Sequence, residues 1–194
     1  MRLDEIFRIN ELAGLKAHNP VQVKTLAELQ RFMARFGFVQ IGGGEFSRVF
    51  ENPKLNDVVK VYNDECYDRF VAFCKAHPDN PHLPRFKGNS IRLRSDARMI
   101  RIERLELLDA KDRANFSALY KVAEERANPK YDPENDFWDV PPEDQLLLDT
   151  ITELLKTRGP CWIDMLGNVM KRGNTLVIVD PYAPDRDGWA STHK

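Results

Sequence analysis

The chain has 194 residues, of which 42% are hydrophobic and 30% are charged, values typical of one globular domain or one small unit of two lobes. Its 29 basic residues nearly balance its 30 acidic residues, so the net charge gives no sign of a nucleic-acid partner. Its three cysteines, Cys66, Cys74 and Cys161, form no Cys-x-x-Cys pair, which argues against a disulfide framework or a zinc site and predicts a reducing, cytoplasmic compartment.

Residues 1–37 are predicted to form a helical extension. Charges at Arg2 and Asp4 are atypical of a signal peptide, and no apolar run approaches the roughly 18 residues that a membrane helix needs, so we expect no membrane partner. Apolar residues follow helical spacing before a break at residues 18–20: Leu3, Ile6, Phe7, Leu12 and Leu15. Thr25 and Glu28 form a capping box that begins a second helix.

A glycine cluster lies between two strand-like pieces within residues 39–50. Because glycine has no Cβ, the backbone at Gly42, Gly43 and Gly44 can approach a ligand closely. The pattern predicts a hairpin with a ligand-facing loop, and a plain turn is the alternative.

The next predicted strand, residues 57–62, carries Lys60 among valines. An unpaired ammonium is costly to bury, so Lys60 either extends to solvent or pairs with a carboxylate. The helix expected next runs to about residue 76 and offers three carboxylates near its start, of which Glu65 is the expected partner: Asp64, Glu65 and Asp68.

The middle of the chain predicts a second hairpin followed by two helices. Residues 91–94 and 99–105 alternate with period two, as strands do. Helices are expected at residues 116–126 and 144–158, on either side of an exposed loop rich in Pro and Asp over residues 128–142.

A third hairpin is predicted near the end of the chain. The apolar run at residues 176–179 indicates a buried strand, and Val169 and Met170 form its partner. Asn168 then lies near Asp180, and two oxygen-bearing side chains suit Mg²⁺, which takes one or two protein ligands together with nucleotide phosphates. Asp164 is placed to accept the proton of an attacking hydroxyl. A turn-capping Asn and a strand-ending Asp are the alternative interpretation.

The order of these features resembles that of protein kinases. In the kinase pattern Gly-x-Gly-x-x-Gly-x-Val, Gly42, Gly44 and Val49 match, while Ser47 stands in place of the third glycine. Lys60 resembles the lysine that holds the nucleotide phosphates.

The end of the chain carries the second half of this resemblance. Asp164 corresponds to the catalytic base of kinases, and Asn168 and Asp180 correspond to the metal-binding Asn and Asp. A closer resemblance, to the early protein kinases of T-seven-type podoviruses, covers roughly residues 38–183. Six short segments carry it: residues 44–47 (GEFS), 58–61 (VVKV), 72–74 (AFC), 164–165 (DM), 167–170 (GNVM) and 180–181 (DP).

The resemblance implies a minimal, two-lobed α+β fold of the protein-kinase type. It would have an antiparallel N-lobe sheet over residues 38–107 and a truncated helical C-lobe over residues 108–194. It implies ATP and Mg²⁺ as cofactors and a protein substrate, a host protein in the host cytoplasm if the chain is viral. Asp164 and Lys60 would be catalytic, and Asn168 and Asp180 would bind the metal. The implied nucleotide-binding residues are Gly42, Gly43, Gly44, Ser47, Val49, Lys60 and Glu65.

The chain departs from the kinase pattern in three ways. Three residues separate Asp164 from Asn168 where kinases have four, and Leu166 stands near the place of the family His. One residue of extended chain spans about 3.3 Å, enough to displace the base. Pro181 and Tyr182 replace the usual Phe-Gly. Too few residues follow Asp180 for an activation segment.

Four functions fit the sequence. The first is an active Ser/Thr kinase, and the second is a kinase-fold protein that inhibits a partner by occlusion. The third is a phosphotransferase for a small molecule, as in the aminoglycoside and sugar kinases that share the Asp-x-His-x-x-Asn and Asp-Pro motifs. The fourth is an unrelated α+β domain. A test of nucleotide binding discriminates the unrelated α+β domain from the other three functions. An assay of phosphate transfer then discriminates the active kinase from the inhibitory binding protein.

Overall fold

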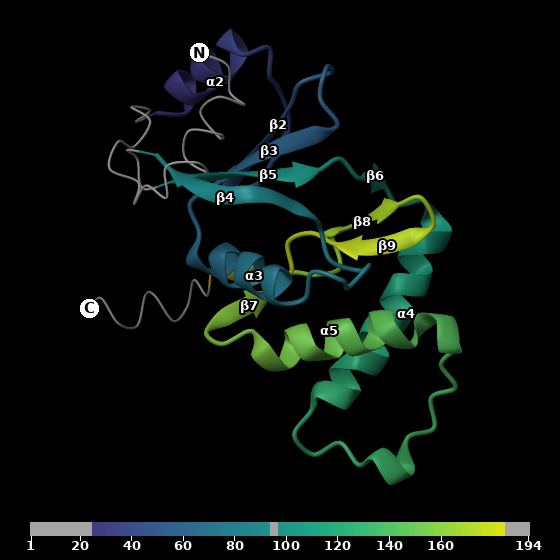
Figure 1. Ribbon diagram of the computed structural model, residues 1–194. Helices are drawn as coiled ribbons and strands as arrows, with labels where there is room; N and C mark the ends of the chain where they lie inside the picture. Colours follow the sequence, from purple (N-terminus) through teal and green to yellow (C-terminus); the bar gives the residue numbers. More distant parts are fainter. Residues whose placement is uncertain (1–24, 94–96, 185–194) are drawn as a thin grey trace, which may run out of the picture. The chain divides into compact units, whose positions relative to one another are not determined.

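The computed structural model describes residues 25–93 and 97–184 and has an α+β fold (Figure 1). Internal contacts divide the chain into two units, the first from residues 1–64 and 85–104 and the second from the rest. The predicted α+β class with an antiparallel sheet is confirmed. The helix predicted within residues 1–24 lies outside the described residues. The division into an extension and two lobes meeting at residue 107 stays a prediction.

The first unit contains a five-stranded antiparallel sheet in the order β1-β2-β3-β5-β4. Two of the predicted hairpins, β1–β2 and β4–β5, are confirmed. The five strands are β1 (Val39–Gly43), β2 (Ser47–Glu51), β3 (Asp57–Tyr62), β4 (Phe86–Arg92) and β5 (Arg98–Glu103). Because β3 is central, its residues are almost all buried, and its alternating side chains serve both faces of the sheet.

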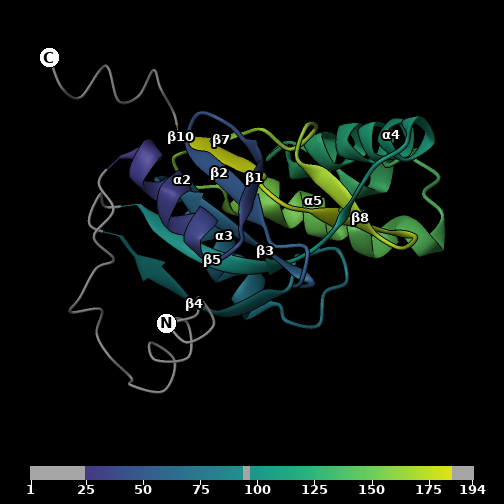
Figure 2. The ribbon, with the colours of Figure 1, turned by 90° about the horizontal axis from the view of Figure 1, so that it is seen from above.

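Helix α2 (Leu26–Arg35) covers one face of this sheet and lies beside β1 (Figure 2). The predicted capping box is present, with Thr25 and Glu28 bonding each other's backbone N–H at 3.2 Å. Leu29 and Met33 of the helix pack in one apolar cluster, and burying each such side chain contributes about 2 kcal/mol. The cluster contains Leu29, Met33, Phe38, Phe50, Val59, Val61, Ile91, Leu93 and Met99.

The described residues of the second unit form three helices, two small sheets and two short 3₁₀ turns. Helices α4 and α5 pack side by side (Figure 1). α4 begins six residues earlier than predicted, because Asp109 caps it by accepting a hydrogen bond from the backbone N–H of Asp112 at 2.9 Å. The helices and turns are α3 (Glu65–Ala76), α4 (Ala110–Ala127), α5 (Gln145–Thr157), η1 (Pro133–Asn135) and η2 (Pro142–Asp144).

The small sheets of the second unit carry the end of the chain. One sheet has the order β6-β8-β9 and the other consists of β7 and β10. Their strands are β6 (Glu106–Leu107), β7 (Cys161–Ile163), β8 (Val169–Arg172), β9 (Thr175–Ile178) and β10 (Tyr182–Pro184). The predicted β8–β9 hairpin is confirmed. No helix in residues 25–93 and 97–184 is long and apolar enough to cross a membrane.

A disulfide joins α3 to β7 and corrects the expectation that the cysteines stay unpaired. Cys66 and Cys161 have their sulfur atoms 2.09 Å apart and their Cα atoms 5.8 Å apart. The partners are 95 residues apart in sequence, so local spacing carried no sign of the pairing. Cys74 is unbonded and buried, and burial raises the pKa of its thiol. The argument for a reducing compartment therefore loses its basis.

Candidate functional site

The β8–β9 hairpin positions Asn168 and Asp180 at its open end. Val169 of β8 pairs with Ile178 of β9, and the tight turn at the other end uses Gly173 with a φ of 59°, which favours glycine. The ladder continues one residue further, because the N–H of Val179 donates to the carbonyl of Asn168 at 2.9 Å. Asp180 is the next residue. The register therefore brings these two predicted metal ligands to the same end of one hairpin.

Asp164 is tied to the same end by two further hydrogen bonds. The side-chain Nδ2 of Asn168 donates to the backbone carbonyl of Asp164 at 2.6 Å. The backbone N–H of Asp164 donates to the carbonyl of Pro181 at 2.9 Å. The loop from Asp164 to Asn168 is thus closed on itself and fastened to the segment after β9. The structure brings Asp164, Asn168 and Asp180 together within the second unit.

The donor atoms at this site suit a hard cation. Because Nδ2 of Asn168 is already hydrogen bonded, its Oδ1 is the amide atom that could face a metal, and the carboxylate of Asp180 would be the second ligand. Among the described residues, no three His, Cys, Asp or Glu side chains are grouped closely enough to hold a metal by themselves. A Mg²⁺ ion here would therefore depend on nucleotide phosphates for its other ligands, as it commonly does.

Tyr182 anchors the segment that follows Asp180. Its ring is buried against Phe70, with ring centres 6.2 Å apart, and its hydroxyl donates to the carbonyl of Leu154 at 2.9 Å. Burial raises the pKa of this hydroxyl, so it stays protonated and continues to donate. Sequence reasoning noticed Tyr182 as a departure from the kinase pattern but did not assign it this anchoring role.

The loop from residue 80 to 84 braces β9 from the side. His82 contributes its carbonyl to the N–H of Ile178 at 3.0 Å and donates from Nδ1 to the carbonyl of Leu176 at 2.9 Å. Burial lowers the pKa of His82, which favours the neutral ring. Arg172 donates to the carbonyls of Pro81 and Leu83 at 3.0 and 3.1 Å. No pattern in the sequence indicated these contacts, which join residues about 90 positions apart.

The glycine hairpin of the first unit is a compact turn in which the three glycines differ. A Cβ at Gly43 would meet the Ser47 carbonyl at 2.9 Å and Cδ of Arg48 at 2.7 Å, whereas a Cβ at Gly42 or Gly44 would meet nothing within 4 Å. Arg48 donates from Nη1 to the carbonyls of Gly44 and Ser47. Arg48 thus closes the loop, a role that the glycine pattern did not predict.

Lys60 lies buried in the middle of the sheet, with 6% of its surface exposed. Val49 pairs with it directly across β2 and β3, so the two side chains share one face of the sheet. Val59 and Val61 point to the other face, where α2 packs. Glu65 is exposed at the start of α3. Since α3 belongs to the second unit, the pairing of Lys60 with Glu65 stays a prediction.

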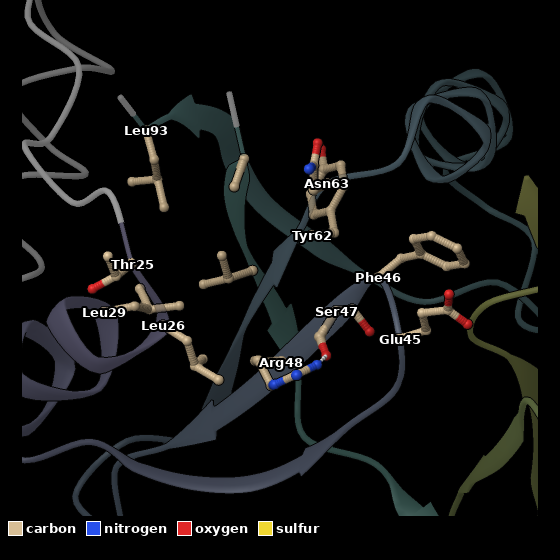
Figure 3. Close-up of a pocket in the computed structure, with 12 residues that line it drawn as sticks. Thr25, Leu26, Leu29, Glu45, Phe46, Ser47, Arg48, Tyr62, Asn63 and Leu93 are labelled. Carbon is tan, nitrogen blue, oxygen red and sulfur yellow. Dashed lines mark hydrogen bonds between the residues drawn. The ribbon is translucent and has the colours of Figure 1, made fainter. Parts of the chain in front are cut away.

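A cavity of about 260 Å³ opens beside the glycine hairpin in the first unit (Figure 3). Leu29 and Val61 line it from the α2 face of the sheet, and Ser47 and Tyr62, which pair across β2 and β3, also line it. Of the predicted nucleotide-binding residues, Ser47 alone lines this cavity. The cavity therefore overlaps the predicted nucleotide-binding residues at Ser47.

No protein-family model and no curated protein matches the sequence. Solved structures of similar shape include the PknI kinase domain of Mycobacterium tuberculosis (14% identity, TM-score 0.36), where the match covers 74% of this chain and 58% of that domain. A thermostable mutant of aminoglycoside phosphotransferase APH(4)-Ia with ADP and hygromycin B gives 13% identity and a TM-score of 0.39, over 78% of this chain and 70% of the enzyme. This chain therefore spans less than two thirds of the PknI domain.

Proposed function

We propose that this chain transfers the γ-phosphoryl group of ATP to a serine or threonine hydroxyl of a protein, with Mg²⁺ as the metal. The observation that carries the proposal is the set of hydrogen bonds that joins Asp164, Asn168 and the segment after β9 at one end of the β8–β9 hairpin. The sequence order of a glycine hairpin, a buried lysine and this acidic loop is the order that phosphoryl transfer needs in protein kinases.

Each residue has a definite part in the proposed reaction. Lys60 holds nucleotide phosphates, and the open space above Gly42 and Gly44 leaves room for them. Mg²⁺ neutralises phosphate charge when bound, and Asn168 and Asp180 hold it. The acceptor oxygen bonds to the γ-phosphorus as the bond to the ADP oxygen breaks, and Asp164 accepts the hydroxyl proton.

The resemblance to podoviral kinases supports a host protein in the host cytoplasm as the acceptor. A second function, a binding protein that inhibits its partner by occlusion, is favoured by the loop with only three residues between Asp164 and Asn168. The hydrogen bond between these two residues supports the first proposal, because the shortened loop still holds Asn168 against the backbone of Asp164.

Nucleotide binding tests the proposed function without any substrate. Saturating Mg-ATP is expected to raise the melting temperature, because a ligand that binds only the folded state stabilises it. Asp180→Asn is expected to reduce the shift seen with Mg-ATP much more than the shift seen with ATP and a chelator. Asp139→Asn, an exposed acid in the loop between α4 and α5, is the matched control and is expected to behave as wild type. An unchanged melting temperature and no heat in calorimetry would remove the proposal.

A further inference from the structure

Two exposed apolar side chains lie on either side of Asp164. Trp162 is 64% exposed and Leu166 is 56% exposed. Cys161, which precedes Trp162, and Met165, which precedes Leu166, are buried, with 3% and 1% of their surfaces exposed. Asp164 is itself exposed. The segment therefore alternates between side chains that build the core of the second unit and side chains that point outward.

The backbone places Trp162 and Asp164 on the same face. Ile163 pairs with Tyr182, and the hydrogen bond from the Asp164 N–H to the Pro181 carbonyl continues the ladder by one residue. The chain is thus extended through Asp164, and residues two apart in an extended chain face the same side, about 6.6 Å apart along it.

The neighbouring strand does not cover the indole with a large side chain. Trp162 pairs with Ala183, which offers a single methyl group. A large aromatic ring left in water gives up the stabilisation that burial would supply, and tryptophan is among the residues that most often anchor a binding partner. A lone exposed leucine needs no explanation, but here a tryptophan and a leucine flank the proposed base on one short segment, and the extended backbone puts Trp162 on the side of Asp164.

We propose that Trp162 and Leu166 contact the phosphoryl acceptor, and that the acceptor is a serine or threonine with apolar neighbours in an extended protein segment. This inference rests on the proposed function, because it takes Asp164 as the base. In an extended segment, side chains two residues from the acceptor lie on the acceptor's own side at the same spacing of about 6.6 Å, so one of them would cover Trp162. A sugar ring would also stack on an indole, but Leu166 offers no hydrogen-bonding group to a sugar.

The test compares two peptides that differ only beside the acceptor serine. One carries Leu two residues before and two residues after the serine, and the other carries Gln at both places. Wild type is expected to show about a tenfold higher kcat/KM for the Leu peptide, mostly through KM, as is usual for one good apolar contact. Trp162→Ala is expected to abolish the preference, and Trp162→Phe to keep most of it, which separates loss of the contact from loss of the fold.

The matched control is Trp138→Ala, which removes a tryptophan from the loop between α4 and α5 in the same unit and is expected to keep the wild-type preference. Equal kcat/KM for the two peptides with wild type, or an undiminished preference in Trp162→Ala, would overturn the inference and leave phosphoryl transfer standing. Transfer to an aminoglycoside or a hexose but to neither peptide would overturn the protein acceptor. Mg-ATP binding with no transfer to any of these acceptors would overturn the proposed function, and the inference with it.

Discussion

Asp57 shows how a single buried charge stabilises the sheet of the first unit. It is 4% exposed and accepts hydrogen bonds from Lys87 and from Arg101, whose Nε lies 3.1 Å from Oδ2. Burial, the largest influence, raises the pKa of this carboxyl, but the hydrogen bonds and charges of Lys87 and Arg101 together outweigh burial, and the pKa is lowered. A lowered native pKa means that the carboxylate stabilises the fold above the unfolded-state pKa of about 3.9, and that this stabilisation is lost as the pH falls through the native pKa.

Asp57→Asn is expected to lower the free energy of unfolding by about 3 kcal/mol near neutral pH, because it leaves two cations without their buried partner. The difference from wild type should begin to shrink as the pH falls below the unfolded-state pKa of about 3.9, and it should be lost once the pH has fallen through the lowered native pKa of Asp57. Urea denaturation at a series of pH values measures this. Exposed Asp139→Asn should change stability by less than about 0.5 kcal/mol. A difference that does not depend on pH would contradict the role given to Asp57.

A second prediction at the residue scale concerns two glycines of the β1–β2 hairpin, Gly43 and Gly42. Gly43→Ala is expected to lower stability by about 1–2 kcal/mol, because the new methyl group would press on the Ser47 carbonyl and the Arg48 side chain. Gly42→Ala is the matched control, since its methyl group would meet no atom within 4 Å. Thermal or urea unfolding compares the two variants, and equal effects would show that the contact with Ser47 and Arg48 is unimportant.

At the scale of elements, the disulfide between α3 and β7 closes a covalent loop that runs from Cys66 to Cys161. A cross-link between residues 95 apart restricts the unfolded chain strongly, by about 4.7 kcal/mol in the loop-entropy account. Replacing both Cys66 and Cys161 by Ser is expected to lower the free energy of unfolding by up to this amount. The same loss should appear when wild type is reduced.

The double variant itself supplies the control for that experiment. A reductant should lower the stability of wild type and leave the variant unchanged, and titration of unfolded, oxidised wild type should find a single thiol, that of Cys74. Three reactive thiols in protein purified without reductant would show that the bond does not form.

The elements of the fold could largely be predicted from the sequence, because each hairpin and helix has a local pattern. The apolar run around Lys60, the capping box at Thr25 and the turn before Thr175 each act over a few residues, and each predicted the correct element. The early start of α4 was missed because its cap, Asp109, precedes the apolar pattern by several residues. The short strands β7 and β10 were missed because three residues carry too little pattern to indicate a strand.

The candidate site could be predicted only in part. The hairpin register that brings Asn168 and Asp180 together follows from local pattern, and the structure has it. The contacts that hold the site do not follow from local pattern. His82 bonds to Leu176 of β9, and Cys66 to Cys161, and each pair is more than 90 positions apart in sequence. Such pairs form because the packing of the second unit brings them together, and their spacing in sequence follows no period.

At the scale of the whole molecule, the central claim is that the acidic loop acts on a phosphoryl group and not only as a stable turn. Asp164 is exposed at the end of β7, and its backbone is fixed at both the amide and the carbonyl. In the proposed function, Asp164 accepts the proton of an incoming hydroxyl, and these two bonds fix the backbone from which its carboxylate would do so.

Transfer of radiolabelled γ-phosphate from Mg-ATP to serine peptides, by wild type and by Asp164→Asn, tests this claim most directly. The account predicts that wild type labels the peptide, and that Asp164→Asn lowers the rate by about 10² to 10⁴, the usual range for acid–base contributions, while nucleotide affinity changes little. Equal labelling by the two proteins, or Mg-ATP binding by wild type with no labelling of any acceptor, would contradict it.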